Sequence, residues 1–313
     1  MLSLYGMLGK LIIYIIFYNR KFRRKVVCRL EMNNIWSEYV QGIMTLYLSR
    51  KLRFDDVFFE QYNKVFKLDS NVNLKILEIG CGPGALAEAL HRWFPKAEIT
   101  AIDRDSNFIS FAQNNISGVT FMEGDATNLP FADNSFDITI SNTVHEHVEP
   151  IAFWGEQRRV LKQGGICLCL SARKGLHCQA PCLEMTVEEK EFWESLPQSE
   201  SEFEKYGICK YPMSEAELPA SMEQNGFSEV TTGYAVIDLT PDAPKYSTQM
   251  AEAMIESKRH NDLEAIKSSH HEADEKVIDA VNAKYDERLR LYHEGIKQWD
   301  TSISLTMIVR GIK

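Results

Sequence analysis

A run of glycines beside an acidic residue is the part of this 313-residue chain best suited to chemistry. Residues 77–84 read Leu-Glu-Ile-Gly-Cys-Gly-Pro-Gly, and the apolar residues before the glycines are typical of a buried strand. Glycines let a ligand approach the backbone without a Cβ in the way, and the helix that follows offers unpaired N–H groups. The pattern predicts a binding loop between a strand and a helix.

Asp103 lies at the distance downstream where a ribose-binding acid is expected. Gly80, Gly82 and Ala85 satisfy the loose dinucleotide pattern GxGxxG/A, so a nicotinamide-dependent oxidoreductase is one interpretation. A second glycine-rich motif or a catalytic Tyr/Lys signature would support it, and the sequence shows neither.

Short apolar runs alternate with segments of helical periodicity around this loop. Such alternation predicts a parallel sheet wound on both faces, in which ligands bind at the carboxyl ends of the strands. We expect strands at 74–79, 98–103, 119–122, 136–141, 166–170, 228–239 and 302–309, and helices at 85–94, 105–115, 150–161 and 214–224.

The remaining segments are expected to flank this sheet. Residues 35–68 have the spacing of two helices, which form a helical N-terminal part of a domain running from 32 to 313. Residues 172–212 lack a clear period and contain three prolines, which predicts a lid-like excursion over the sheet edge. Residues 243–298 are polar with helical spacing and predict a helical insert before the last strand.

Five motifs in order resemble those of class I S-adenosylmethionine-dependent methyltransferases. The resemblance implies a doubly wound, seven-stranded, mostly parallel sheet, which is the Rossmann-like methyltransferase fold, and S-adenosylmethionine as the cofactor. The motifs are Glu78-x-Gly80-x-Gly82-x-Gly84, Asp103 at the end of the second strand, Gly124-Asp125-Ala126, Phe136–Asn142 and Arg159–Gly165.

The resemblance also implies a cofactor site built from these strand ends. Asp103 is expected to accept the ribose hydroxyls and Asp125 the exocyclic amine of adenine, with helix or turn capping as the alternative for each. Asp137 is expected to support the loop rather than to touch the ligand. The residues expected to bind the cofactor are Glu78, Gly80, Cys81, Gly82, Gly84, Asp103, Arg104, Asp125, Ala126 and Asn142.

The segment after the fourth strand, Asn142–Glu149, is expected to face the transferred methyl group. His145 occupies a place that is often apolar in the family, so it is the candidate general base, with a packing role as the alternative. A zinc-protease interpretation fails because His145 and His147 are two residues apart rather than four. The predicted function is methyl transfer to a small molecule; the alternatives are the nicotinamide oxidoreductase and a non-catalytic cofactor-binding module.

The predicted leading helices carry polar residues that are candidates for the far side of the pocket. These are Tyr39, Tyr47, Arg50 and Arg53. We expect the two tyrosines to lie in the helix core and the two arginines in solvent, as is usual for these residue types.

Composition and charge limit the partners. Lys+Arg number 35 and Asp+Glu 44, for a net charge of -9; residues 1–31 contribute +6, so the rest of the chain carries -15. An acidic body repels phosphate backbones, so no nucleic-acid partner is expected. Seven cysteines without framework spacing favour reduced thiols in the cytoplasm, and no metal site is expected.

The first 31 residues are unlike the rest. Leu2–Tyr18 is apolar apart from Ser3 and Lys10, and a basic cluster follows. Three alternatives stay open: a membrane anchor that keeps the domain in the cytoplasm, a packed helix, and a mis-called extension before Met32. Membrane contact is expected only through residues 2–25, and the oligomeric state is left open.

Overall fold

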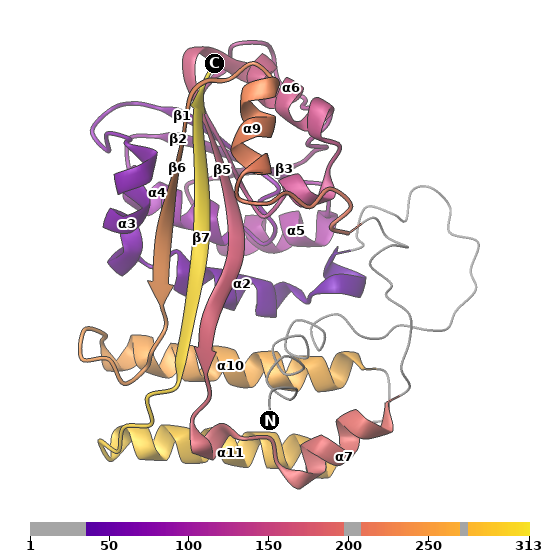
Figure 1. The fold of residues 1–313 in the computed structure, drawn as a ribbon, viewed down its shortest axis with the longest axis vertical. Coiled ribbons are helices and arrows are strands. Elements are labelled where there is room, and N and C mark those ends of the chain that lie inside the picture. The colour runs from indigo at the N-terminus through magenta and orange to yellow at the C-terminus, as the bar shows by residue number, and fades with distance from the viewer. Residues whose placement is uncertain (1–35, 197–207, 270–274) are drawn as a thin grey trace.

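The computed structural model describes residues 36–196, 208–269 and 275–313, which form a seven-stranded sheet with helices on both sides (Figure 1). The strand order is β3-β2-β1-β4-β5-β7-β6; the first five strands are mutually parallel, and β7 is antiparallel to both its neighbours. The predicted doubly wound, mostly parallel sheet is therefore confirmed. Its strands are β1 (Lys75–Ile79), β2 (Glu98–Asp103), β3 (Thr120–Glu123), β4 (Phe136–Asn142), β5 (Leu161–Cys178), β6 (Ser228–Asp238) and β7 (Thr301–Ile312).

Alternating side chains of the central strands enter two apolar clusters, one on each face of the sheet. On β1, Ile76 packs with Tyr62 on one face, whereas Leu77 packs with Trp154 on the other. Strands buried on both faces explain the nearly continuous apolar runs of the sequence. The first face is covered by α2 (Ile43–Arg53), α3 (Phe59–Phe66), α4 (Ala85–Trp93) and α5 (Ser106–Asn115), and the second by α6 (Pro150–Val160) and α9 (Glu217–Gln224).

Strand β5 is longer than the sequence indicated. Residues 172–178, expected in the excursion, continue the strand and pair with β7 as far as Cys178↔Thr301. The missed signal is the alternation through Ser171 and Arg173, whose side chains are largely buried. The chain then forms η5 (Pro181–Leu183) and α7 (Val187–Ser195), which opens with a Thr186–Glu189 capping box that the sequence also contained.

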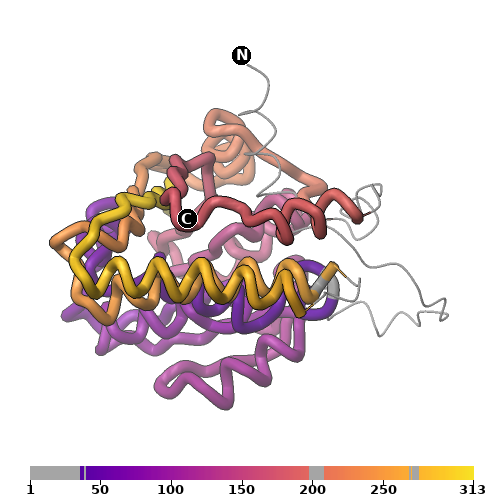
Figure 2. Tube along the Cα trace, turned by 90° about the horizontal axis from the view of Figure 1, so that it is seen from below, coloured from indigo at the N-terminus to yellow at the C-terminus, as the bar shows by residue number. Residues whose placement is uncertain are grey.

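The expected insert before the last strand is a pair of helices with a core of its own. Helices α10 (Thr248–Ser268) and α11 (Glu275–His293) pack together around a cluster that includes Ile255, Val281 and Tyr285. Helix α10 also packs on α2. Seen from below, α11 runs across the outer layer with α7 beside it (Figure 2). Helix α2 therefore lies between the insert and the sheet.

The predictions for residues 1–31 concern a segment that lies outside the described residues. Within the described ranges, none of the helices is both long and apolar enough to cross a membrane. The first described element is a short π-helix, η2 (Trp36–Val40), and its residue Ser37 donates two hydrogen bonds to Asp105 at the start of α5.

Candidate active site

The glycine loop after β1 has a backbone that other residues rarely adopt. Gly80, Gly82 and Gly84 have φ angles of +69°, +53° and +90°. A Cβ on Gly80 would lie 2.4 Å from Val144 Cγ2, and one on Gly84 would lie 2.8 Å from Ile116 Cδ1. The sequence predicted that these glycines make room for a ligand. At Gly80 and Gly84 the structure shows a further reason, since neighbouring side chains fill the space.

Asp103 at the end of β2 is tied directly to this loop. Its Oδ2 accepts a hydrogen bond from the Gly82 N–H at 2.8 Å, and its Oδ1 accepts one from the Asp105 N–H at 2.9 Å. Burial raises the pKa of Asp103, and the two backbone donors oppose that shift. Asp103 is partly exposed, so a carboxylate that accepts hydrogen bonds lies at the surface beside the glycine loop.

Glu78 near the end of β1 and Cys81 within the loop both have buried side chains. The Glu78 side chain is buried, and its Oε2 has no hydrogen-bond partner within the described part of the chain. Burial, followed by the charge of Asp103, raises its pKa well above the usual carboxyl value. Burial also raises the pKa of the Cys81 thiol, so this group stays protonated. An orphaned buried carboxylate oxygen is costly unless a ligand donor satisfies it.

The other predicted cofactor residues follow the neighbouring strands. The Gly124 N–H donates to the Asp103 carbonyl at 3.0 Å, which places Asp125 and Ala126 beside the end of β2. Asp125 is exposed, and its Oδ1 accepts from both the N–H and the hydroxyl of Thr127 at 2.8 Å. The turn-capping contact is therefore present, and adenine binding stays a prediction. Arg104 is exposed after β2, and Asn142 ends β4.

Asp137 supports the start of the strands and not, as had been predicted for it, the glycine loop. Its carboxylate accepts from the Lys75 N–H at 2.9 Å and from Lys162 Nζ at 2.7 Å. It thereby joins β4 to the start of β1 and to β5, at the opposite end of the strands from the glycine loop.

His145 lies in the short helix η4 (His145–His147) and is 1 % exposed. Neither ring nitrogen has a hydrogen-bond partner among the residues that the structure describes. Burial lowers the pKa of His145 to about 4, the nearby Arg173 also lowers it, and Glu146 acts in the opposite direction. The imidazole is therefore neutral at neutral pH and has a lone pair available. Sequence reasoning missed Arg173 because it placed that residue in the excursion.

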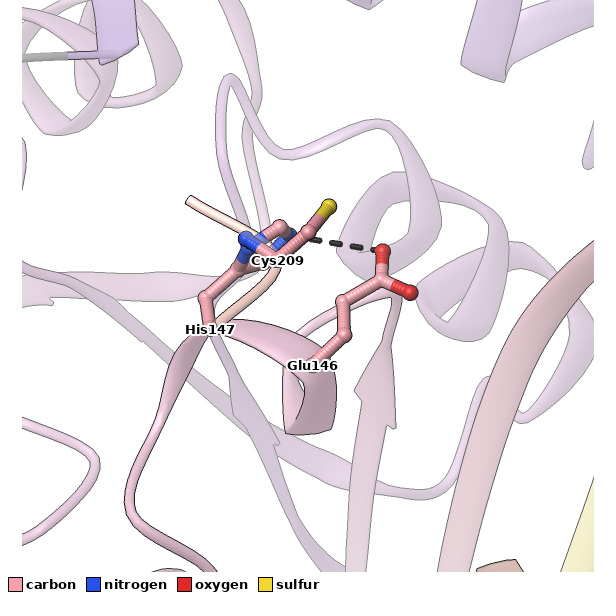
Figure 3. A group of neighbouring side chains, drawn as sticks. All are labelled: Glu146, His147 and Cys209. Carbon is pink, nitrogen blue, oxygen red and sulfur yellow. Dashed lines mark hydrogen bonds and ion pairs between the residues drawn. The ribbon is translucent and has the colours of Figure 1, made fainter. Parts of the chain in front are cut away.

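Glu146, His147 and Cys209 form a neighbouring group with three potential metal ligands (Figure 3). The Cys209 N–H donates to His147 Nδ1 at 2.9 Å, and His147 Nε2 lies 3.4 Å from Glu146 Oε1. With Nδ1 accepting, the neutral ring carries its proton on Nε2, so neither nitrogen offers a lone pair to a metal. Burial raises the pKa of the Cys209 thiol to about 11. The arrangement is a hydrogen-bonded link between η4 and the segment before α9.

The prediction for the arginines of α2 is wrong. Tyr47 is buried as expected, and the side chain of Tyr39 lies outside the described residues. Arg50 and Arg53 are only partly exposed, and burial lowers the pKa of both guanidiniums. The sequence could not show this, since Thr143, which Arg50 contacts, lies 93 residues further along the chain.

The fold and the loop define a class of protein. A seven-stranded sheet with a reversed last strand, whose glycine loop is bonded to an acid at the end of β2, is the arrangement that the resemblance implied. Residues 77–169 match a family model described as a methyltransferase domain. This part of the chain is a methyltransferase domain of the class I, S-adenosylmethionine-dependent type.

Relatives and solved structures agree with this classification. The chain is 41% identical over 103 residues to a fatty-acid O-methyltransferase of Mycolicibacterium smegmatis, covering 32% of this chain and 37% of that protein. It is 33% identical over 99 residues to a ubiquinone/menaquinone biosynthesis C-methyltransferase of Desulfotalea psychrophila, covering 31% and 40%. The matches thus span about two fifths of these relatives' length.

A Haemonchus contortus phosphoethanolamine N-methyltransferase 2, solved with S-adenosyl-L-methionine, shares the fold. Its TM-score is 0.52 at 15% identity, over 93% of this chain and 61% of that one.

Proposed function

We propose that this protein transfers a methyl group from S-adenosylmethionine to a small-molecule acceptor. The observation that carries the proposal is the bond between the Gly82 N–H and Asp103, beside the orphaned carboxylate oxygen of Glu78. The relatives support the acceptor class, since the name of one specifies a fatty acid and the name of the other specifies ubiquinone/menaquinone biosynthesis.

The residues present fit the cofactor. Asp103 would hold the ribose hydroxyls, because an ionised carboxylate is an acceptor only and its outward lone pairs stay available beside the two backbone bonds. Glu78 Oε2 would accept from an ammonium, which removes the cost of leaving it unpartnered. Asp125 would receive the adenine amine. When bound, the cofactor supplies an electrophilic methyl group on a sulfonium centre.

The acceptor would approach from the turn after β4. Methyl transfer of this kind depends mainly on alignment of the two reactants and on exclusion of water. The acceptor's lone pair forms the new bond to the methyl carbon, and the electron pair of the broken C–S bond stays on sulfur. His145 is neutral and unpartnered, so it would take the proton of an acceptor that carries one.

Isothermal titration calorimetry with S-adenosylmethionine and S-adenosylhomocysteine tests the cofactor site. We expect both to bind the wild-type protein, and Asp103→Ala to weaken binding by about tenfold to a hundredfold, as for loss of hydrogen bonds to a charged group. The matched control is Asp133→Ala, an exposed acid that pairs with Arg159.

Equal affinity in a folded Asp103→Ala sample would refute the assignment of this site. Tight binding of NADH in place of both nucleosides would instead favour the oxidoreductase. If the protein binds the cofactor but methylates no member of a small-molecule library, the result would favour a non-catalytic cofactor-binding module.

A further inference from the structure

Arg50 of α2 contacts the turn on the acceptor side of the candidate site, and the charge of Arg53 acts on it. The Arg50 Nη2 atom is 3.4 Å from Thr143 Oγ1, in the turn that joins β4 to His145. Arg53 follows about one helical turn later, and its carbonyl accepts the Tyr62 hydroxyl at 3.2 Å. Both side chains thus come from the helix that separates the sheet from the insert.

Neither arginine has an acidic partner in the described ranges 36–196, 208–269 and 275–313. No carboxylate oxygen there lies within 4.0 Å of either guanidinium. Burial lowers the pKa of Arg50 to about 9, and the charge of Arg53 is the next cause. Glu146 attracts Arg50 from a longer distance, but its carboxylate contacts His147 at 3.4 Å.

Two other cations, Arg173 of β5 and Lys258 of α10, each have an acidic partner. Arg173 Nε lies 3.3 Å from Glu215, and Lys258 Nζ lies 2.6 Å from Asp300. The pair on α2 is therefore an excess of positive charge in a desolvated place, which costs free energy in the absence of an anion. Both side chains keep partial exposure, so an anion from solution can reach them.

We infer that Arg50 and Arg53 bind an anionic group of the acceptor, a carboxylate or a phosphate, and hold it beside the turn that carries His145. Guanidinium groups suit this task because their N–H donors match the two oxygens of such an anion. The inference rests on the proposed methyl transfer and adds the chemical class of the acceptor.

Thermal unfolding of the full chain, saturated with S-adenosylhomocysteine, tests the anion site. Acetate and inorganic phosphate are added against chloride at constant ionic strength, to the wild-type protein and to the single variants Arg50→Gln and Arg53→Gln. Arg290→Gln is the control, because Arg290 is an exposed arginine of α11.

We expect at least one of the two anions to raise the Tm of wild type and of Arg290→Gln, and each α2 variant to weaken its apparent affinity by about tenfold to a hundredfold. Equal effects in all four proteins, or no effect of either anion on wild type, would overturn the inference.

Octanoate, octyl phosphate and octanol then distinguish the sources of the anion on one carbon skeleton. Stronger binding of octanoate than of the other two indicates a carboxylate, and stronger binding of octyl phosphate indicates a phosphate. If octanol binds as tightly as octanoate and octyl phosphate, the inference is contradicted. If the anion test fails while S-adenosylhomocysteine binds normally, only the anion site is refuted. If S-adenosylhomocysteine does not bind to the wild-type protein, the proposed function itself is refuted.

Discussion

The arginine in the core of the insert and the two arginines of α2 differ in how their charge is compensated. In the insert, Arg288 is fully buried and contacts Asp300 at 2.6 Å and Asp242 at 2.8 Å, while Lys258 contacts the second oxygen of Asp300. The arginines of α2 have no such acids among the described residues.

The difference separates a structural role from a binding role. The carboxylates around Arg288 come from the ends of β6 and β7, so the network fixes α11 to the sheet. Although burial would raise the pKa of Asp300, Lys258 and Arg288 outweigh it and hold that pKa below its usual value. A compensated network stabilises the fold, whereas uncompensated charges favour a ligand of opposite sign.

The largest effect is expected from breaking the compensated network. Arg288→Met leaves Asp242 buried without its cation, and Asp300 with only Lys258. We expect the free energy of unfolding to fall by about 3–5 kcal/mol. Urea denaturation monitored by circular dichroism measures this. Arg290→Met, two residues along the same helix, changes an exposed side chain and should leave the free energy of unfolding almost unchanged. A similar loss of stability in both variants would contradict a structural role that is specific to the buried network.

The next largest effect is expected from His145, a buried neutral base whose ring nitrogens have no hydrogen-bond partner among the described residues. Its pKa is about 4 in the folded protein and 6.5 ordinarily, so the unfolded chain binds the proton more tightly. Stability contributed by the neutral ring is therefore present above pH 6.5 and is lost as the pH falls toward 4, by about 3 kcal/mol.

His145→Gln should remove most of that pH dependence, which urea denaturation at several pH values between 4 and 7 measures. His293→Gln, at an exposed histidine of α11, is the control and should keep it. An unchanged pH profile in His145→Gln would show that the ring is solvated.

The smallest effect is expected at the α2 arginines in the absence of ligand. Arg53→Met removes a desolvated charge without leaving an acid unpaired, so the free energy of unfolding should stay the same or rise by up to about 1 kcal/mol. Urea denaturation in chloride buffer measures it. A loss as large as that of Arg288→Met would mean that Arg53 has a structural role.

Much of the fold could be predicted because its signals are local. The apolar runs of β1, β2 and β4, the helical periods between them and the helix-capping Asp105 are each readable within a dozen residues. The second half of β5 was missed because its pairing depends on β7, more than a hundred residues later. A strand that is only half buried gives a weak pattern.

The candidate site could be predicted only in part, for the same reason. Glycines in the left-handed region and an acid after β2 are recognisable by residue type and spacing. The hydrogen bond from Cys209 to His147 joins residues far apart in the chain, and no local pattern indicates it. The environment of Arg50 was likewise hidden, since the sequence shows a charge on a helix but not what packs over it.

The amino-acid sequence by itself determined the order of strands and helices, the glycine loop and the acid beside it, because backbone preference and hydrophobic period act over a few residues. Only the tertiary structure decided which polar groups lose water and which find a partner. Arg288 has acidic partners, whereas Arg50 has none among the described residues. That difference depends on contacts between segments that are far apart in the sequence.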